Sequence, residues 1–170
     1  MKALIIILLS CTFLCNADEV LTRNERIIAL TLLGEARGEG KRGLFAVGCV
    51  IQRRSWEKKI NAAQVCLQKW QFSIWNGTDR QGKYRLKKES ELYHLWDSKE
   101  MMYARHLARC LNKDDITLMD ITEGANHYCT LKCKPYWAFK MEKEEDSGLF
   151  QMVAIKPTKI IGNHKFYKLP

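Results

Sequence analysis

Apolar residues recur every three to four positions after residue 22, which predicts an amphipathic helix. Thr22 and Glu25 stand where a capping box places them, because the Thr hydroxyl and the Glu carboxylate satisfy free backbone N–H groups of a new helix. The helix is expected to begin at about Arg23. Its apolar stripe consists of Ile27, Ile28, Leu30 and Leu33. Residues 34–40 contain three glycines, which weaken a helix, so Glu35 is expected near the helix C-terminus beside a glycine-rich loop.

The same helical spacing of apolar residues predicts three more helices. A second helix is predicted over residues 43–56, and Asn61 is expected to cap a short helix that ends at Leu67. Residues 90–111 carry apolar side chains at helical spacing throughout, so the longest helix of the chain is predicted there.

The remaining segments lack a helical period. Residues 68–88 mix aromatic residues with glycines, as in an irregular loop, and the length of this loop suggests a function. Residues 149–155 and 159–167 read as two short strands. No internal repeat or second domain is evident. The expected fold class is therefore α+β, mainly helical, in a single domain with a small C-terminal β element.

The first residues have the pattern of a cleaved signal peptide. Lys2 is the only charge there, residues 3–15 are uncharged, and small residues precede Asp18. Residues 1–17 are therefore expected to be removed, leaving residues 18–170 as the mature domain of a secreted, periplasmic or envelope-associated protein. An uncleaved membrane anchor and a lipoprotein signal are the alternatives, and either would hold the domain at a membrane surface.

The chain has 170 residues and a formal net charge of +9, from which the expected cleavage removes one lysine. An exported basic protein is attracted to the anionic polymers of a cell envelope. These polymers are therefore the expected partners, and nucleic acid is not an expected partner. The basic cluster at residues 83–88 is also typical of nucleic-acid-binding proteins, which are therefore a competing class of function. Five cysteines would remain after cleavage, so at least one thiol cannot pair within the chain. They are Cys49, Cys66, Cys110, Cys129 and Cys133.

Two carboxyl groups are the first candidates for chemistry. Glu35 and Glu39 lie four residues apart, so on a continuing helix they would face the same way. A carboxyl group near other acids and apolar walls keeps its proton longer, and a protonated carboxyl is what a general acid needs. In the cleavage of a glycosidic bond, such an acid protonates the bridging oxygen. Two solvent-exposed glutamates at a helix end are the simpler interpretation of the same pattern.

The wider pattern around these glutamates resembles a known family. Residues 34–40 and 43–54 are similar to the motif G-E-A-R-G-E, a short gap, then A-V-A-x-V-I-x-N-R, of the cell wall hydrolases typified by bacterial spore cortex-lytic enzymes. Further blocks match in the same order at residues 65–66, 71–75, 125–128, 135–138 and 161–167. The departures are Gln52 for Leu, Arg53 for Asn, Ile74 for a frequent Cys, and an insertion at residues 141–147 that is expected to be a solvated loop.

The resemblance implies a lysozyme-like domain that cleaves the glycan strand of peptidoglycan between N-acetylmuramic acid and N-acetylglucosamine, commonly as a lytic transglycosylase. Glu35 matches the catalytic Glu of the family and would act first as acid and then as base, while a 1,6-anhydro ring closes on the muramic acid. A monomer without metal or other cofactor is expected. The expected substrate-binding residues are Glu39, Phe72, Ser73, Trp75, His127, Tyr128 and Trp137. For the Phe and Trp side chains, packing in the core is the alternative.

Three other activities stay open. A hydrolytic muramidase needs a second carboxylate, for which Glu39, Asp79 and Asp97 are candidates. A non-catalytic wall-binding module would keep the aromatic residues without needing the acid. A zinc-dependent N-acetylmuramoyl-L-alanine amidase would need a set of metal ligands. The candidate ligands are His127, Cys129, Cys133 and His164.

Overall fold

The computed structural model describes residues 20–113, 115–144 and 149–170, so the expected signal peptide lies outside the described residues. The helices are α1 (Arg23–Ala36), α2 (Gly40–Lys58), α3 (Ala62–Leu67) and α4 (Met101–Leu111), with short 3-10 segments η1 (Arg37–Glu39), η2 (Ser73–Trp75), η3 (Glu89–Asp97) and η4 (Tyr136–Ala138). The strands are β1 (Asn76–Thr78), β2 (Tyr84–Leu86), β3 (His127–Thr130), β4 (Phe139–Lys143), β5 (Phe150–Ala154), β6 (Lys159–Ile161) and β7 (His164–Tyr167).

Both predicted helix caps are present. The backbone N–H of Thr22 donates to Glu25 Oε2 at 2.8 Å, and the N–H of Glu25 donates back to Thr22 Oγ1 at 3.3 Å. Asn61 caps α3 in the same way, accepting from the N–H of Gln64 at 2.8 Å. These caps satisfy backbone donors that a helix leaves free at its first turn. The predicted starts of α1 and α3 are therefore confirmed.

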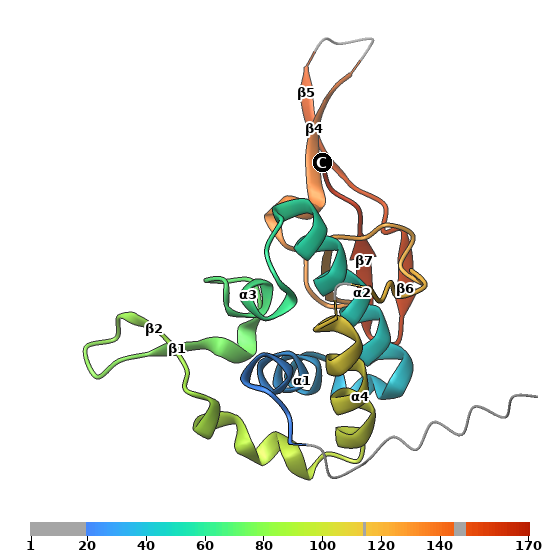
Figure 1. Ribbon diagram of the computed structural model, residues 1–170. Helices are drawn as coiled ribbons and strands as arrows, with labels where there is room; N and C mark the ends of the chain where they lie inside the picture. The colour runs from blue at the N-terminus through green and yellow to red at the C-terminus, as the bar shows by residue number, and fades with distance from the viewer. Residues whose placement is uncertain (1–19, 114, 145–148) are drawn as a thin grey trace, which may run out of the picture.

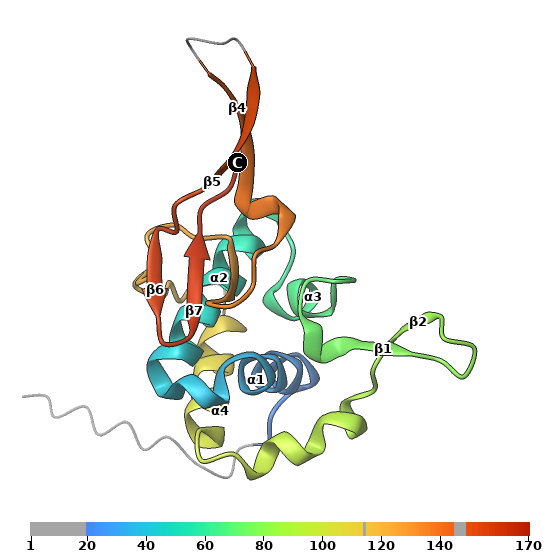
Figure 2. The ribbon, with the colours of Figure 1, turned by 180° about the vertical axis from the view of Figure 1, so that it is seen from behind.

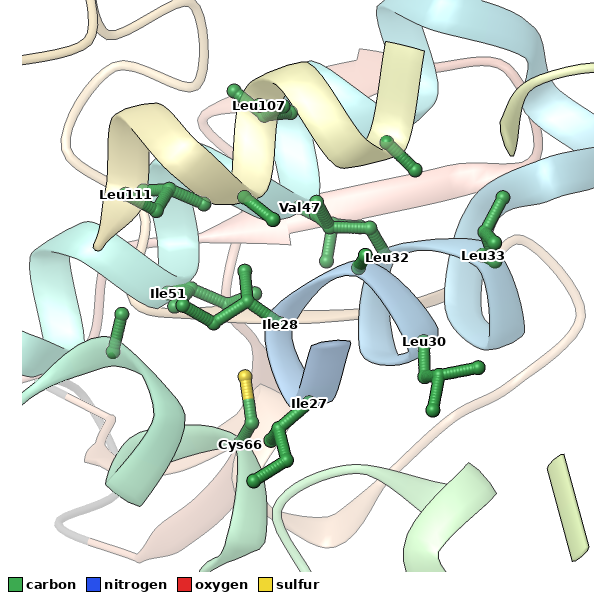
Figure 3. Close-up of a cluster of buried hydrophobic side chains, with 14 of the residues drawn as sticks. Ile27, Ile28, Leu30, Leu32, Leu33, Val47, Ile51, Cys66, Leu107 and Leu111 are labelled. Carbon is green, nitrogen blue, oxygen red and sulfur yellow. The ribbon is translucent and has the colours of Figure 1, made fainter. Parts of the chain in front are cut away.

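Helix α1 is the centre of the hydrophobic core. It packs against α2, α3 and α4 (Figure 1). Every residue from Ile27 to Leu33 is buried, as expected for a helix with apolar neighbours on all sides. Figure 3 shows side chains of α1 meeting Val47 and Ile51 of α2, Cys66 of α3 and Leu107 and Leu111 of α4.

The single long helix predicted over residues 90–111 is wrong. The chain forms η3 and then α4, with Ser98 between them in an extended conformation. Ser98 donates its N–H to Leu95 O at 3.2 Å, which closes a 3-10 turn instead of continuing an α-helix. Leu92 and Leu95 of η3 and Leu107 of α4 are all buried, so these apolar residues pack in the core although the two segments do not form one helix. Among the described residues, the longest helix is α2, with 19 residues.

In the part of the chain that the structure describes, the strands form three small antiparallel sheets. Strand β7 pairs with β3 on one side and β6 on the other, and this sheet lies beside α2 (Figure 2). Strands β1 and β2 form one hairpin, and β4 and β5 form another that projects from the body of the domain (Figures 1 and 2). The elements pack as one α+β domain, which confirms that fold class.

The β structure differs from the sequence expectation in three places. The strand expected over 159–167 is a hairpin of β6 and β7, turned at Gly162 with φ +56°, which glycine adopts without strain. The loop expected over 68–88 contains the β1–β2 hairpin. The insertion expected to be a solvated loop is in part β4, while residues 145–147 lie outside the described part. These strands are three to five residues long, too short to show a clear alternation in the sequence.

Over the part of the chain that the structure describes, no helix combines the length and apolarity needed to cross a bilayer.

Candidate functional site

Glu35 lies near the C-terminal end of α1 and is held by three hydrogen-bond donors. Its Oε1 accepts from the hydroxyl of Ser73 at 3.1 Å and from the backbone N–H of Ile74 at 3.2 Å. Its Oε2 accepts from the hydroxyl of Tyr128 at 2.8 Å. The side chain is half-buried. Two segments that are distant in the sequence therefore fix both carboxylate oxygens, and the structure brings Glu35, Ser73 and Tyr128 together as expected.

The segment that carries Ser73 and Ile74 is anchored directly on α1. The indole N–H of Trp75 donates to Thr31 Oγ1 at 2.8 Å, one turn before Glu35. Gly34 provides room for Ile74, because a Cβ at position 34 would lie 2.0 Å from Ile74 Cδ1. The glycine beside the candidate acid is thus required by close packing, which places the Ile74 N–H within reach of the carboxylate.

Phe72 and Trp75 have packing roles. Each is only 1% exposed and belongs to the hydrophobic core. Their rings are not available to stack on a sugar. Both residues therefore pack in the core, which was the alternative role expected for them. Ser73 between them is exposed, which leaves its hydroxyl accessible beside Glu35.

Tyr128 approaches Glu35 from strand β3. It pairs with Phe166 of β7, and its ring lies 5.7 Å from the Phe166 ring and 5.3 Å from that of His164. Burial and the neighbouring Glu35 carboxylate raise the pKa of Tyr128 well above its ordinary value. The phenol therefore remains an O–H donor at neutral pH.

Arg54 is a buried cation behind this pair, and sequence reasoning did not single it out. Its Nε donates to Asn126 O at 2.6 Å and its guanidinium lies 5.4 Å from the Phe72 ring centre. Burial lowers the pKa of Arg54, while Tyr128, Glu57, Cys66 and Glu35 counteract this. A guanidinium stays charged in proteins, so Glu35 and Tyr128 interact electrostatically with a buried positive charge. The sequence signal for Arg54 is its position at the end of the first block that resembles the family motif.

Glu39 does not share a helix face with Glu35, because α1 ends at Ala36 and η1 follows. Its Oε2 accepts from the N–H of Asn163 at 2.8 Å and its Oε1 accepts from Asn163 Nδ2 at 3.0 Å. The backbone hydrogen bond from Asn163 is the main cause that lowers the pKa of Glu39. A Cβ at Gly162 would lie 2.0 Å from Glu39 Oε2. Glu39 thus ties the start of α2 to the β6–β7 turn, a structural role.

His127 and Trp137 lie away from the Glu35 carboxylate. Successive residues of a strand point to opposite faces, so His127 and Tyr128 of β3 face opposite sides of the sheet. The His127 ring instead lies 5.2 Å from Trp137, whose ring is 5.4 Å from Tyr167. The structure therefore does not join these two expected binding residues to the Glu35 site.

The candidate zinc ligands are divided between the same two faces. His164 shares the Tyr128 face of the sheet, whereas Cys129 of β3 shares the His127 face. Within the described ranges, no group of three or more His, Cys, Asp or Glu side chains is placed to hold a metal ion. Among the described residues, Cys49, Cys66, Cys129 and Cys133 are free thiols.

The chain belongs to the cell wall hydrolase family, since the family model matches residues 38–167. This confirms the resemblance and defines the class of protein as an enzyme that acts on peptidoglycan. The matched range includes Glu39, Ser73, Arg54 and Tyr128, and it begins three residues after Glu35. No curated protein and no solved structure matches the chain.

Proposed function

We propose that the protein cleaves the glycan strand of peptidoglycan as a lytic transglycosylase, on a lysozyme-like domain, with Glu35 as general acid and then general base. The observation that carries the proposal is the position of the Glu35 carboxylate, held at both oxygens by Ser73, Ile74 and Tyr128. Fixed geometry at the proton-transferring group is what general acid–base catalysis requires.

The surroundings of Glu35 suit both protonation states. A hydroxyl donates to a carboxylate and accepts from a protonated carboxyl, so Ser73 and Tyr128 can serve either form. In the first step Glu35 gives its proton to the bridging oxygen while the C1–O bond breaks. In the second step the C6 hydroxyl of the muramic acid bonds to C1 and passes its proton to the Glu35 carboxylate, which restores the enzyme.

Two of the three other candidate carboxylates, Glu39 and Asp79, have structural roles, which favours this mechanism over hydrolysis. A hydrolase needs a second carboxylate that faces the reacting sugar. Glu39 accepts two hydrogen bonds from Asn163, and Asp79 accepts from the N–H groups of Gln81 and Lys83 in the β1–β2 turn at 2.9 and 2.8 Å. Both therefore hold turns. A transglycosylase needs no second carboxylate, because no water attacks.

Export is part of the proposal. Peptidoglycan lies outside the cytoplasm, and the basic charge of the chain suits the anionic envelope. Cleavage after residue 17 would leave the capping residue Thr22 and all of α1 intact. Intact-mass measurement of the protein recovered from outside the cells that produce it tests this cleavage.

The activity is tested by mass spectrometry of the soluble products released from purified peptidoglycan. The wild-type protein should release fragments with 1,6-anhydro-muramic ends, and Glu35→Gln, which removes the titrating proton and keeps the shape, should release none. Glu39→Gln is the matched control and should retain turnover. Reducing muramic ends would identify a hydrolase, and free stem peptides with intact glycan would identify an amidase; either result contradicts the proposal.

A further inference from the structure

Trp70 is an exposed aromatic residue with a strained backbone. Its side chain is 63% exposed, and its φ of +64° lies in the left-handed region that residues other than glycine seldom adopt. Backbone strain of this kind is concentrated at binding and catalytic sites, where the surrounding structure maintains it. A large apolar side chain held in this way on the surface needs a reason beyond packing.

The indole is part of an ordered aromatic pair. Its ring centre lies 4.5 Å from that of Tyr84 of β2, at an interplanar angle of 47°. Lys69 Nζ lies 5.5 Å from the Trp70 ring centre and 4.9 Å from the Tyr84 ring centre. The hydroxyl oxygen of Tyr84 is buried and has no hydrogen-bond partner among the described residues. We call Trp70, Tyr84 and Lys69 the aromatic platform.

The same segment carries the aromatic platform and the donors to Glu35. Trp70 lies three residues before Ser73, so their Cα atoms are at most about 11 Å apart. The N–H of Gln71 donates to Gln68 O at 3.1 Å, and the N–H of Lys87 donates to Trp75 O at 2.9 Å. The first bond closes the turn that carries Trp70, directly before η2, and the second joins the residue after β2 to η2. Both halves of the platform are therefore attached to the segment that donates to the Glu35 carboxylate.

We infer that the aromatic platform is a subsite for an N-acetylhexosamine ring of the glycan strand, one or more sugars away from the bond that Glu35 cleaves. This inference rests on the proposed function. The C–H face of a pyranose ring is apolar and packs on an aromatic ring, and the exposed Trp70 indole offers such a surface, supported by Tyr84. Lys69 Nζ, which lies over the two rings, is placed to attract a carboxylate of the lactyl or peptide substituents.

Nucleic acid is the competing ligand, because aromatic residues beside a basic segment also bind unpaired bases. The charge of that segment is partly neutralised: Arg85 makes a two-pronged ion pair with Glu91, with Nη1 and Nη2 at 2.7 and 2.6 Å from the carboxylate oxygens. The observations therefore favour a sugar over a polyanion.

The test is binding without turnover, in the mature chain carrying Glu35→Gln. The probe is the β-1,4-linked tetramer of N-acetylglucosamine, titrated by calorimetry, with purified peptidoglycan in a pull-down as the second probe. Adding Trp70→Ala should weaken binding of the tetramer about 3- to 10-fold, the range of one lost aromatic contact. Trp56→Ala is the matched control, because Trp56 is 50% exposed on α2 and outside the platform. It should bind as the parent does.

A second variant separates binding from folding. Trp70→Gly should bind as weakly as Trp70→Ala but melt at a higher temperature, since glycine adopts φ +64° without strain. Equal affinity of the Trp70→Ala and parent proteins would overturn the inference. So would a Trp70-dependent preference for a single-stranded oligonucleotide over the tetramer.

The two proposals can fail separately. If wild-type protein releases no fragments from peptidoglycan while tetramer binding still depends on Trp70, the subsite stands and the proposed activity is wrong. If fragments appear but neither tetramer binding nor kcat/KM changes in Trp70→Ala, the activity stands and the subsite is overturned.

Discussion

The hydroxyl of Tyr128 donates a 2.8 Å hydrogen bond to Glu35 Oε2 across 93 positions of the sequence. It joins the central helix of the core to the β3–β7–β6 sheet at the candidate acid. The remaining donors to Glu35 come from a third part of the chain, at η2. The site therefore depends on the folded domain as a whole, and its parts can be tested one donor at a time.

Tyr128→Phe should lower kcat on purified peptidoglycan about 10- to 100-fold, because a hydrogen bond to a charged group contributes about 1.5 to 3 kcal/mol. KM should change less, since the phenol contacts the acid. Ser73→Ala should cost less than Tyr128→Phe, because the Ile74 N–H continues to hold Oε1. Release of soluble fragments gives both parameters. An unchanged kcat in Tyr128→Phe would show that this bond has no part in the reaction.

Gly34→Ala should impair activity by displacing Ile74. The new Cβ would lie 2.0 Å from Ile74 Cδ1, so the segment that donates to Glu35 must move. Overpacking costs about 1 to 3 kcal/mol, partly offset by about 1 kcal/mol of better helix propensity. The melting temperature should fall slightly and kcat/KM about tenfold or more.

A double mutant tests this explanation of Gly34. Truncating the side chain in Ile74→Ala makes room for a Cβ at position 34, so Gly34→Ala with Ile74→Ala should recover much of the lost activity. Ile74→Ala alone is the control. If the double mutant is no better than Gly34→Ala, then Gly34 serves the site in some way other than the Ile74 contact.

Parts of this structure follow from local sequence and parts do not. The caps at Thr22 and Asn61 involve residues three apart, so the sequence alone predicts them. The sequence does not reveal the break at Ser98, because apolar residues every three to four positions can form the buried side of a 3-10 segment or of an α-helix. The family resemblance located Glu35, but its partners are set by long-range packing.

The aromatic residues show the same limit. Phe72 and Trp75, the residues expected to bind sugar, are buried, whereas Trp70, to which the sequence assigns no role, is exposed. All three lie in one stretch without a clear period, so nothing in the pattern separates a ring that fills the core from one that faces solvent. Only the packing of η2 on α1 makes that distinction.

Glu39 should contribute stability that is lost in acid. Its hydrogen bonds from Asn163 lower the folded-state pKa below the ordinary value of 4.5. The contribution is therefore complete above pH 4.5 and declines as the pH falls through the folded-state pKa. The difference in unfolding free energy between wild type and Glu39→Gln should be about 1 kcal/mol near pH 6, allowing for solvent exposure, and should shrink below pH 4.5.

His164 titrates at a higher pH than Glu39 and is electrostatically coupled to it. Burial lowers its pKa below 6.5, so its protonation destabilises the fold as the pH falls below that value. The Glu39 carboxylate counteracts part of this shift, so Glu39→Gln loses somewhat more stability from His164 protonation than wild type does, and the change below pH 4.5 is the part that reports the carboxylate itself. Urea unfolding at pH 6, 5, 4 and 3 measures the difference in unfolding free energy between the two proteins. A difference that does not change with pH would mean that Glu39 is not the titrating group.

Cys66 should resist alkylation until the protein unfolds. Its side chain is fully buried against α1, and burial raises the pKa of the thiol to about 12. Burial likewise raises the pKa of Cys49 to about 11. Iodoacetamide reacts with the thiolate, which is scarce at pH 8 for both groups, whereas the exposed Cys133 is accessible. Peptide mapping after timed labelling should find Cys133 modified first and Cys66 last, with Cys66 reacting at the unfolding rate. Labelling of Cys66 as fast as Cys133 in the folded protein would contradict its place in the core.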